Sequence, residues 1–307
     1  RVVDGAGKVL LPGFVNAHTH LPMTLMRGYG GGCDLHTWLN QYIFPAEARL
    51  DSRAVAAGAG LGLAEMIASG VTCVADMYMH TGTIAEQILE AGISANLSCG
   101  GVYFGAPEDF SPETCGDCRN QAALTEEWHG AGAGQILVDA SVHGEYTSNP
   151  PLWRWMAEYA AEHRLGMHVH VSETQSEHQA SLERWGKTPI QALDGCGVWD
   201  CGRSLAAHCV YTTEEDWALM AEKGISCVHN PWSNLKLGSG VAPIPAMMRA
   251  GVNVALGTDG MSSHNSADLF SDIKLAAVLH NGVERDPMAV NAWAALEMAT
   301  VNGARAL

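Results

Sequence analysis

The chain has 307 residues, of which 47% are hydrophobic and 16% charged, so it is long enough to bury a large core. Its 33 acidic and 17 basic residues give a net charge of −16, which repels phosphate backbones and anionic lipids. We therefore expect neither nucleic acid nor a membrane as partner, and we find no transmembrane segment or signal peptide. The nine cysteines do not form the dense framework of a small secreted domain, which favours the cytoplasm.

The first twelve residues predict a short strand over residues 1–3, a turn at Asp4-Gly5 and a second strand over residues 8–11. Both ends of the sequence look cut. From residue 14 onwards, short apolar runs alternate with longer helical patterns. The strands are expected at 14–20, 72–77, 95–99, 136–143, 167–172, 205–209, 226–229 and 254–258. The helices are expected at 52–69, 83–91, 151–164, 176–184, 213–223 and 244–249, with Asp286-Pro287 opening the last one.

Eight strands that each precede a helical segment, and that are apolar throughout, predict an α/β fold with a closed (β/α)8 TIM barrel. An open doubly wound sheet is the competing architecture. Because no G-x-G-x-x-G follows the first strand, a dinucleotide-binding version of that sheet is disfavoured.

Two loop regions carry possible functional residues. Gly30-Gly31-Gly32 leads into a Trp-containing segment over residues 35–49, which is either a lid or substrate wall or a simple spacer. Cys115 and Cys118 have the C-x-x-C spacing of a zinc or redox motif, but no second pair follows. We therefore favour incidental loop thiols over a minor zinc site or a disulfide.

Polar residues recur where the predicted strands end, which is the active-site face of a parallel barrel. A single strand histidine is more often a satisfied core residue, but one end of six strands carries histidine or acid. These residues are His18, His20, His143, His168, His170, Glu173, His208, His229 and Asp259.

The pair His18 and His20 is the strongest sign of a metal site, because residues i and i+2 of a strand share one face. A catalytic zinc takes three or four nitrogen or oxygen ligands and keeps one position for water. One histidine of the strand at 167–172 completes the set, and His170 is better placed than His168, which lies one layer deeper. Asp259 can reach the ion or its water. Fe²⁺ accepts the same mixed set.

The remaining polar residues fit hydrolytic attack on an sp² carbon that carries a leaving group. Asp259 can accept a proton from the attacking water. His208 can hydrogen-bond the developing oxyanion, and Glu173 can deliver a proton to a ring nitrogen and to the leaving amine.

The sequence resembles the amidohydrolase superfamily over almost its whole length. The likeness is carried by PGFVNAHTH at 12–20, HVSET at 170–174, AHCV at 207–210, SNLKLGSGVAPIP at 233–245 and ALGTDGMSSHNSADLF at 255–270. More narrowly it resembles the methylthioadenosine/S-adenosylhomocysteine deaminases, beside the triazine hydrolases and guanine deaminases. The resemblance implies a distorted barrel over 13–307 with one divalent metal, usually Zn²⁺. It also implies a small β-sandwich that is largely missing here, with residues 1–12 as its remnant.

The resemblance also implies roles for individual residues. The metal ligands would be His18, His20, His170 and Asp259, and the catalytic residues would be Glu173, His208 and Asp259. Substrate would be held by Glu173 together with Glu47 on the ribose hydroxyls, Trp38 packed on the substrate and His143 on the nucleoside. For Glu47 the competing reading is a helix-start carboxylate, and for Trp38 it is simple packing.

The sequence departs from the pattern of those deaminases in the group that act on S-adenosylhomocysteine. Cys99 stands where they carry an arginine for the amino-acid carboxylate, and Glu145 adds a negative charge expected near the pocket. Both changes disfavour an anionic substrate.

The expected activity is hydrolytic deamination of an adenine nucleoside, of the 5′-methylthioadenosine, 5′-deoxyadenosine or adenosine type, or of a related aminated heterocycle as small-molecule substrate. A triazine-type chlorohydrolase or aminohydrolase, or a guanine, pterin or cytosine deaminase, is the alternative within this chemistry. A non-catalytic metal-binding fragment is the alternative from another class. A homo-oligomer is left open.

Overall fold

Two parallel five-stranded sheets form the centre of the molecule in the computed structural model, which describes residue 2 and residues 4–307. Their strand orders are β10-β1-β2-β3-β4 and β5-β6-β7-β8-β9. The first sheet contains β1 (Phe14–His20), β2 (Val71–Met77), β3 (Ser94–Ser98), β4 (Ile136–Val138) and β10 (Asp259–Gly260). The second contains β5 (Ala140–Gly144), β6 (Met167–Val171), β7 (Ser204–His208), β8 (Ile225–His229) and β9 (Val254–Leu256).

The two sheets are joined where one predicted strand changes partner. A single residue, Asp139, separates β4, which pairs with β3, from β5, which pairs with β6. Two residues separate β9, which pairs with β8, from β10, which pairs with β1. Nine of the ten short strands fall on the eight predicted segments, with the segment at 136–143 divided into β4 and β5, and β10 lies just beyond the predicted end of the last segment at residue 258. This confirms the predicted α/β fold of the distorted (β/α)8 type.

Gly257 allows the second junction to close. A Cβ at this position would lie 2.8 Å from the His18 carbonyl oxygen and 2.5 Å from the Asn230 side-chain oxygen. Contacts this short exclude any side chain, so glycine is required where β9 passes close to β1.

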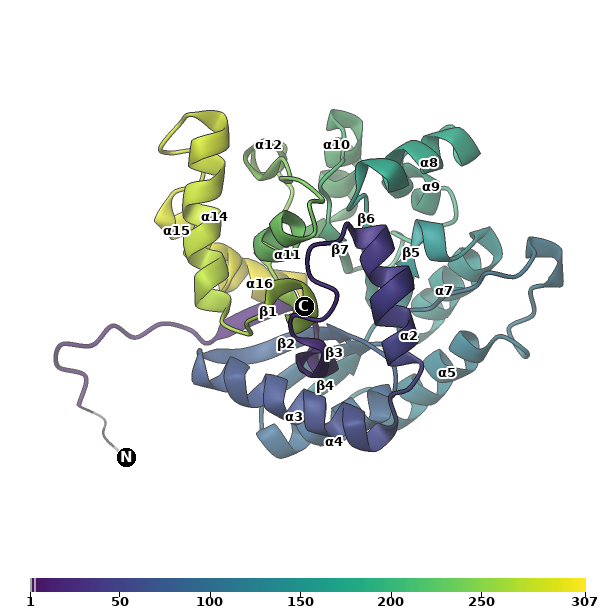
Figure 1. Ribbon diagram of the computed structural model, residues 1–307, viewed down its shortest axis with the longest axis horizontal. Coiled ribbons are helices and arrows are strands. Elements are labelled where there is room, and N and C mark those ends of the chain that lie inside the picture. The colour runs from purple at the N-terminus through teal and green to yellow at the C-terminus, as the bar shows by residue number, and fades with distance from the viewer. Residues whose placement is uncertain (1, 3) are drawn as a thin grey trace.

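Helices surround the strands on the outside (Figure 1). The longer ones are α3 (Ser52–Ala68), α4 (Thr81–Ala91), α5 (Gly116–Trp128), α7 (Pro150–His163), α8 (Gln175–Trp185), α10 (Glu214–Lys223) and α14 (Leu269–Glu284). The shorter ones are α1 (Leu35–Trp38), α2 (Phe44–Glu47), α6 (Ala131–Gly134), α9 (Pro189–Asp194), α11 (Pro231–Lys236), α12 (Ile244–Arg249), α13 (Met261–His264), α15 (Ala292–Met298) and α16 (Val301–Ala306). No helix among the described residues is both long and apolar enough to cross a bilayer.

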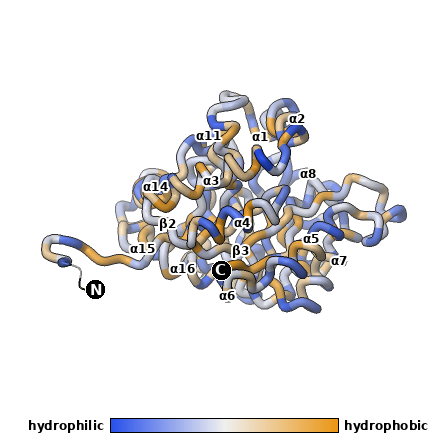
Figure 2. Tube along the Cα trace, turned by 90° about the horizontal axis from the view of Figure 1, so that it is seen from below, coloured by the Kyte–Doolittle hydropathy of each residue, from blue (hydrophilic) through white to orange (hydrophobic). Residues whose placement is uncertain are grey.

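Two sequence expectations are wrong at the chain's ends. The described residues before Phe14 form no strand, although a turn does form at Asp4 to Lys8 through Lys8 N–H to the Gly5 carbonyl. The segment has no neighbouring strand to satisfy its backbone groups, and Val9 and Leu10 are exposed in the tail that Figure 2 shows leaving the body. The part of that prediction over residues 1 and 3 lies outside the described residues. Whether residues 1–12 are a sandwich remnant stays a prediction.

Asp286-Pro287 does not open the last helix. The Asp286 side chain accepts a hydrogen bond from the Met288 N–H and forms a turn instead. The helix α15 begins five residues later, where the Asn291 side chain caps the Ala294 N–H.

A buried histidine pair links the barrel to an outer helix. His229 at the end of β8 and His280 of α14 face each other with 3.0 Å between their Nε2 atoms. Burial lowers the pKa of His280 from 6.5 to about 4, and burial with the neighbouring His280 lowers the pKa of His229 well below its usual range. Both imidazoles are therefore neutral in the folded protein. Their contribution to stability is complete above about pH 6.5, where unfolded histidine is neutral too, and is lost as the pH falls towards about 4.

We expect the His280→Asn variant to show a shallower acid destabilisation than the unmodified chain. Asparagine retains a polar partner for His229 but cannot take up a proton, so one source of the pH dependence is removed. The measurement is the urea midpoint of unfolding at several pH values between about 7 and about 5. His163→Asn, at an exposed position on α7, is the matched control. If the urea midpoint fell equally steeply with pH in all three proteins, the acid destabilisation could not be assigned to the His229–His280 pair.

Candidate active site

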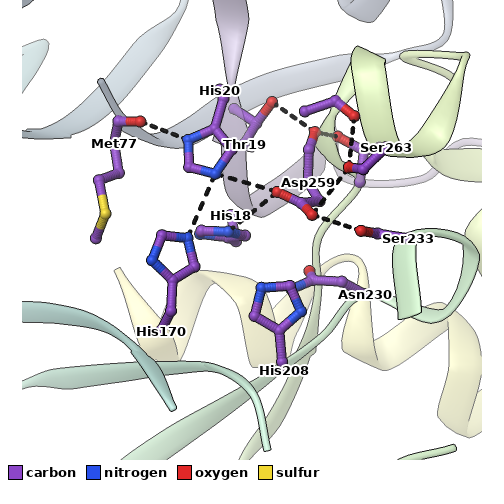
Figure 3. A network of polar contacts seen from close by, with 12 residues as sticks. His18, Thr19, His20, Met77, His170, His208, Asn230, Ser233, Asp259 and Ser263 are labelled. Atoms are coloured by element: carbon purple, nitrogen blue, oxygen red, sulfur yellow. Dashed lines mark hydrogen bonds and ion pairs between the residues drawn. The ribbon is translucent and has the colours of Figure 1, made fainter. Parts of the chain in front are cut away.

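Side chains from four strands converge where the barrel strands end (Figure 3). His20 Nε2 lies 3.1 Å from Asp259 Oδ1 and 3.4 Å from His170 Nε2. His18 Nε2 lies 3.4 Å from the same Asp259 oxygen. His208 joins from β7, and its ligand atom lies within 4.8 Å of those of His18 and His170. The structure therefore brings all four proposed metal ligands together, with His208 beside them.

Each of the three histidines proposed as metal ligands has its Nδ1 atom within hydrogen-bond distance of a neighbour. The Nδ1 atoms of His20 and His170 face the backbone carbonyls of Met77 and His143. A carbonyl can only accept, so both Nδ1 atoms carry protons, and Nε2 is the nitrogen of each ring that can bind a cation. His18 Nδ1 lies 2.8 Å from His168 Nε2, which places His168 in a supporting layer below the cluster.

Asp259 presents one carboxylate oxygen to the histidines and keeps the other satisfied. Its Oδ2 accepts hydrogen bonds from the hydroxyls of Ser233 at 2.6 Å and Ser263 at 3.0 Å. Burial alone would raise the pKa of Asp259, but the contacts with His18 and His20 hold it well below its usual range. The same carboxylate raises the pKa of His20 to about 9 against the effect of burial, whereas burial lowers that of His18 to about 4.

This donor set fits a divalent cation. Imidazole lone pairs and a carboxylate oxygen face one another in a space where His18 Nε2 is buried and makes no hydrogen bond to any described residue. Lone pairs at this separation repel unless a proton or a cation lies between them. Three nitrogens and one oxygen are also the ligand types that zinc takes in catalytic sites.

The backbone is strained where the strands deliver these residues. Ser172, His208 and Asp259 have φ values of 51°, 74° and 62°, in the left-handed region that non-glycine residues avoid. Such conformations cost on the order of 1–3 kcal/mol each and are typical of active sites.

Glu173 and His208 lie side by side next to the cluster. Glu173 Oε2 is 3.6 Å from His208 Nε2, and Glu173 Oε1 accepts a hydrogen bond from Ser239. His208 Nδ1 lies 2.8 Å from the Asn234 side-chain oxygen, which fixes the ring. Burial raises the pKa of the Glu173 carboxyl, partly offset by His208, which suits a group that must carry and release a proton.

Sequence reasoning missed Glu177 as the support of Glu173. Its carboxylate accepts hydrogen bonds from the backbone N–H groups of Ser172 and Glu173 at 2.8 and 2.7 Å. The signal was available, because Glu177 lies at the third position of α8 after the capping residue Thr174, where an acid can reach back to preceding N–H groups.

A cavity of about 430 Å³ opens beside the cluster, within the size range of small-molecule sites. One wall holds His20, His170, His208, Asp259 and Glu173, and the others are mainly apolar. The segment formed by α1, a π-helical turn (Leu39–Ile43) and α2 supplies Leu35, Leu39, Ile43, Phe44 and Glu47. Of the two readings left open for residues 35–49, the structure favours the cavity wall.

The predicted substrate residues are only partly placed in this cavity. Glu47 and His143 line it, and burial raises the pKa of Glu47 while the Tyr78 hydroxyl beside it opposes that shift. Trp38 is not among the residues that line this cavity, and its contact with substrate stays a prediction. Leu35, Leu39 and Ile43 of the same segment do line the cavity, whereas Trp38 is buried and donates its Nε1–H to the Tyr29 carbonyl.

Three other expectations concern charge and thiols. Glu145 is paired with Arg184 at 2.7 Å and adds no charge to the cavity wall, so that expectation is wrong. Cys99 does line the cavity. Cys115 and Cys118 are free, buried thiols at the start of α5 rather than in a loop.

The comparisons with known proteins agree with this geometry. Residues 9–307 match the amidohydrolase family. The chain is 44% identical over its whole length to the 5-methylthioadenosine/S-adenosylhomocysteine deaminase of Moorella thermoacetica, and 42% identical to the 5'-deoxyadenosine deaminase of Methanothermobacter thermautotrophicus. It spans 70% of the length of each.

A solved structure shows the same fold. An adenosine deaminase from Xanthomonas campestris with bound zinc superimposes with a TM-score of 0.88 at 36% identity. The match covers 96% of this chain and 66% of that one. The family match, the full-length relatives and the barrel with its histidine and aspartate cluster lead to one conclusion: the chain belongs to the amidohydrolase family.

Proposed function

We propose that the chain is a zinc-dependent hydrolytic deaminase of adenine nucleosides, acting on 5′-methylthioadenosine, 5′-deoxyadenosine or adenosine. The observation that carries the proposal is the cavity in which Glu173 and His208 lie against the histidine and aspartate cluster. Relatives at 42% and 44% identity named as nucleoside deaminases support the reaction and substrate class. The zinc reported in the related adenosine deaminase supports the choice of metal.

The residues divide the reaction among them. His18, His20, His170 and Asp259 would hold the zinc ion, which supplies a Lewis acid and a nucleophilic water at neutral pH. Asp259 accepts the proton of the attacking water, and its serine partners keep its second oxygen occupied. Glu173 protonates a ring nitrogen as the water oxygen bonds to the amine-bearing carbon. It then takes the proton of the added hydroxyl as the carbon–oxygen double bond forms and delivers that proton to the amine, which leaves as ammonia. Proton exchange with solvent returns Asp259 to its ionised form and Glu173 to its protonated form. His208 hydrogen-bonds the oxygen that is added.

The cavity suits a neutral nucleoside. Its apolar walls would enclose the purine ring, and the side of the cavity away from the metal ligands would admit the sugar and its 5′ substituent. Glu47 would accept hydrogen bonds from the ribose hydroxyls, and His143, which also lines the cavity, would contact the nucleoside. All nine cysteines are free thiols, which supports a reducing, cytoplasmic location.

A panel of aminated rings tests the proposal. Zinc-loaded protein is offered adenine nucleosides, guanine, cytosine, a pterin and a chlorotriazine with alkylamino groups, and ammonia, amine and chloride release are measured. We expect ammonia from the adenine nucleosides with the highest kcat/KM. Turnover confined to triazines or free bases would overturn the substrate class, and zinc binding without any turnover would favour a non-catalytic fragment.

The metal assignment predicts the zinc content of variants. His18→Ala and His20→Ala should each retain far less than one zinc per chain, because each removes one imidazole of the buried cluster. His229→Ala, a strand-end histidine that faces α14 instead, should retain the zinc of the unmodified protein. The measurement is zinc per chain after dialysis, by elemental analysis. Undiminished zinc in both cluster variants would place the ion elsewhere.

The proton-shuttle assignment predicts the behaviour of Glu173→Gln. Glutamine preserves the shape and the hydrogen bond from Ser239 but cannot donate a proton to the ring, so kcat should fall by ~10²–10⁴ while zinc content stays unchanged. Zinc analysis and ammonia release on the same sample separate the two effects. Near-normal turnover by this variant would refute the shuttle.

The ribose assignment predicts a substrate-specific effect at Glu47. Glu47→Gln should raise the KM for adenosine by ~10-fold, because a charged acceptor makes the stronger hydrogen bond to a hydroxyl. It should affect 2′,3′-dideoxyadenosine little, since that substrate lacks both ribose hydroxyls. Steady-state kinetics on the two nucleosides provide the comparison. A similar loss on both substrates would show that Glu47 acts through the cavity wall and not through ribose.

A further inference from the structure

The walls of the cavity carry acidic groups and no fixed cation. Four carboxylates line it, and no lysine or arginine occurs among the described residues that do so. Asp259 and Glu173 belong to the metal end, and Glu47 lies beside Tyr78. The fourth, Asp117, has no part in the proposed reaction.

Asp117 lies at the side of the cavity away from the metal-binding strands. It is the second residue of α5, and it lines the cavity together with Cys99, Gly100, Val102 and Phe104, which follow β3. In the sheet, β2 separates β3 from the ligand strand β1. The amine-bearing ring must meet the metal end, so the remainder of a substrate extends towards these other walls.

A second cavity of about 460 Å³ adjoins this side and extends the acidic region. It is lined by residues of α4 and α5, and it shares Met79, Cys99 and Asp117 with the first cavity. Its other carboxylate is Glu127, and again none of its described lining residues is lysine or arginine. A long 5′ substituent that left the first cavity on this side would pass Asp117 and enter this space.

We propose that Asp117 is a specificity-determining residue that selects 5′ substituents that are uncharged or cationic and rejects those carrying a carboxylate. The inference rests on the proposed function. A negative charge at the wall repels a substrate carboxylate and attracts an ammonium group without any direct contact. The preferred substrates are accordingly nucleosides with short neutral or aminoalkyl 5′ groups, and S-adenosylhomocysteine is a poor substrate.

Asp117 also has a structural role that the test must separate from this one. Its Oδ2 accepts a hydrogen bond from the Val102 N–H at 2.9 Å and so ties the loop after β3 to α5. Asparagine offers an oxygen in the same place, so Asp117→Asn removes the charge and retains this hydrogen bond. Asp109→Asn removes an exposed charge from the same loop region, outside both cavities, and is the matched control.

Three substrates isolate the charge effect because they share the adenine nucleoside. They are 5′-methylthioadenosine, which is neutral, 5′-S-(3-aminopropyl)-5′-thioadenosine, which carries only an ammonium group, and S-adenosylhomocysteine, which adds a carboxylate. The measurement is kcat/KM for each, at low and high ionic strength, with the unmodified protein and both variants.

We expect the unmodified protein to favour the first two substrates over S-adenosylhomocysteine. Asp117→Asn should raise the kcat/KM of S-adenosylhomocysteine relative to that of 5′-methylthioadenosine by about fivefold. It should lower the kcat/KM of the aminopropyl substrate, relative to the same reference, by a similar factor. Salt should shrink both changes, because Asp117 is half-exposed and its field is screened. Asp109→Asn should leave both ratios unchanged.

Two results would overturn the inference. One is equal use of S-adenosylhomocysteine and 5′-methylthioadenosine by the unmodified protein. The other is that Asp117→Asn changes the relative kcat/KM of both charged substrates in the same direction, or changes neither. Asp117 would then act only as an anchor for the loop after β3. Absence of ammonia from all three substrates is a different failure, since it refutes the proposed nucleoside deamination itself.

Discussion

The site depends on one electrostatic constraint: three imidazoles face one carboxylate oxygen in a buried space, and a single divalent cation satisfies all four groups together. The carbonyls of Met77 and His143 keep protons on Nδ1 of His20 and His170, which directs both Nε2 lone pairs inwards. Asp259 faces them with an oxygen that its serine partners leave free. Much of the surrounding structure, including the strained residues at the strand ends, positions groups around this point.

The barrel separates the chemistry of the reaction from the choice of substrate. Strands β1, β6, β7 and β10 carry the groups that would bind metal and move protons. Parallel pairing fixes β1, β6 and β7 on both sides and holds β10 against β1. The walls that face the rest of the substrate come from the α1–α2 segment and from the loop after β3, which are less constrained by the sheet. Substrate preference can therefore change at Glu47 or Asp117 without disturbing the ligands, a division common among barrel enzymes.

The sequence was most informative where the chemistry follows from local periodicity. The i, i+2 spacing on a strand was sufficient to expect His18 and His20 on one face, and the same logic ranked His170 above His168, which the structure places in a supporting layer. Periodicity does not reveal where a strand changes partner, so the interruptions at Asp139 and at Gly257-Thr258 could not be foreseen. Nor did it reveal the face of a short helical segment, because Trp38 and its neighbour Leu39 are both apolar and only one meets the cavity. Glu145 shows a further limit, since its partner Arg184 lies on a later helix. The catalytic and ligand roles themselves stay predictions.

The most direct test of the account is a titration of metal-free protein with zinc, followed by ammonia release from 5′-methylthioadenosine. The lone-pair cluster holds one ion, so the rate should rise in proportion to added zinc and reach its plateau at one ion per chain. Full activity in metal-free protein, or a plateau reached only at two ions per chain, would contradict a single metal centre built from His18, His20, His170 and Asp259.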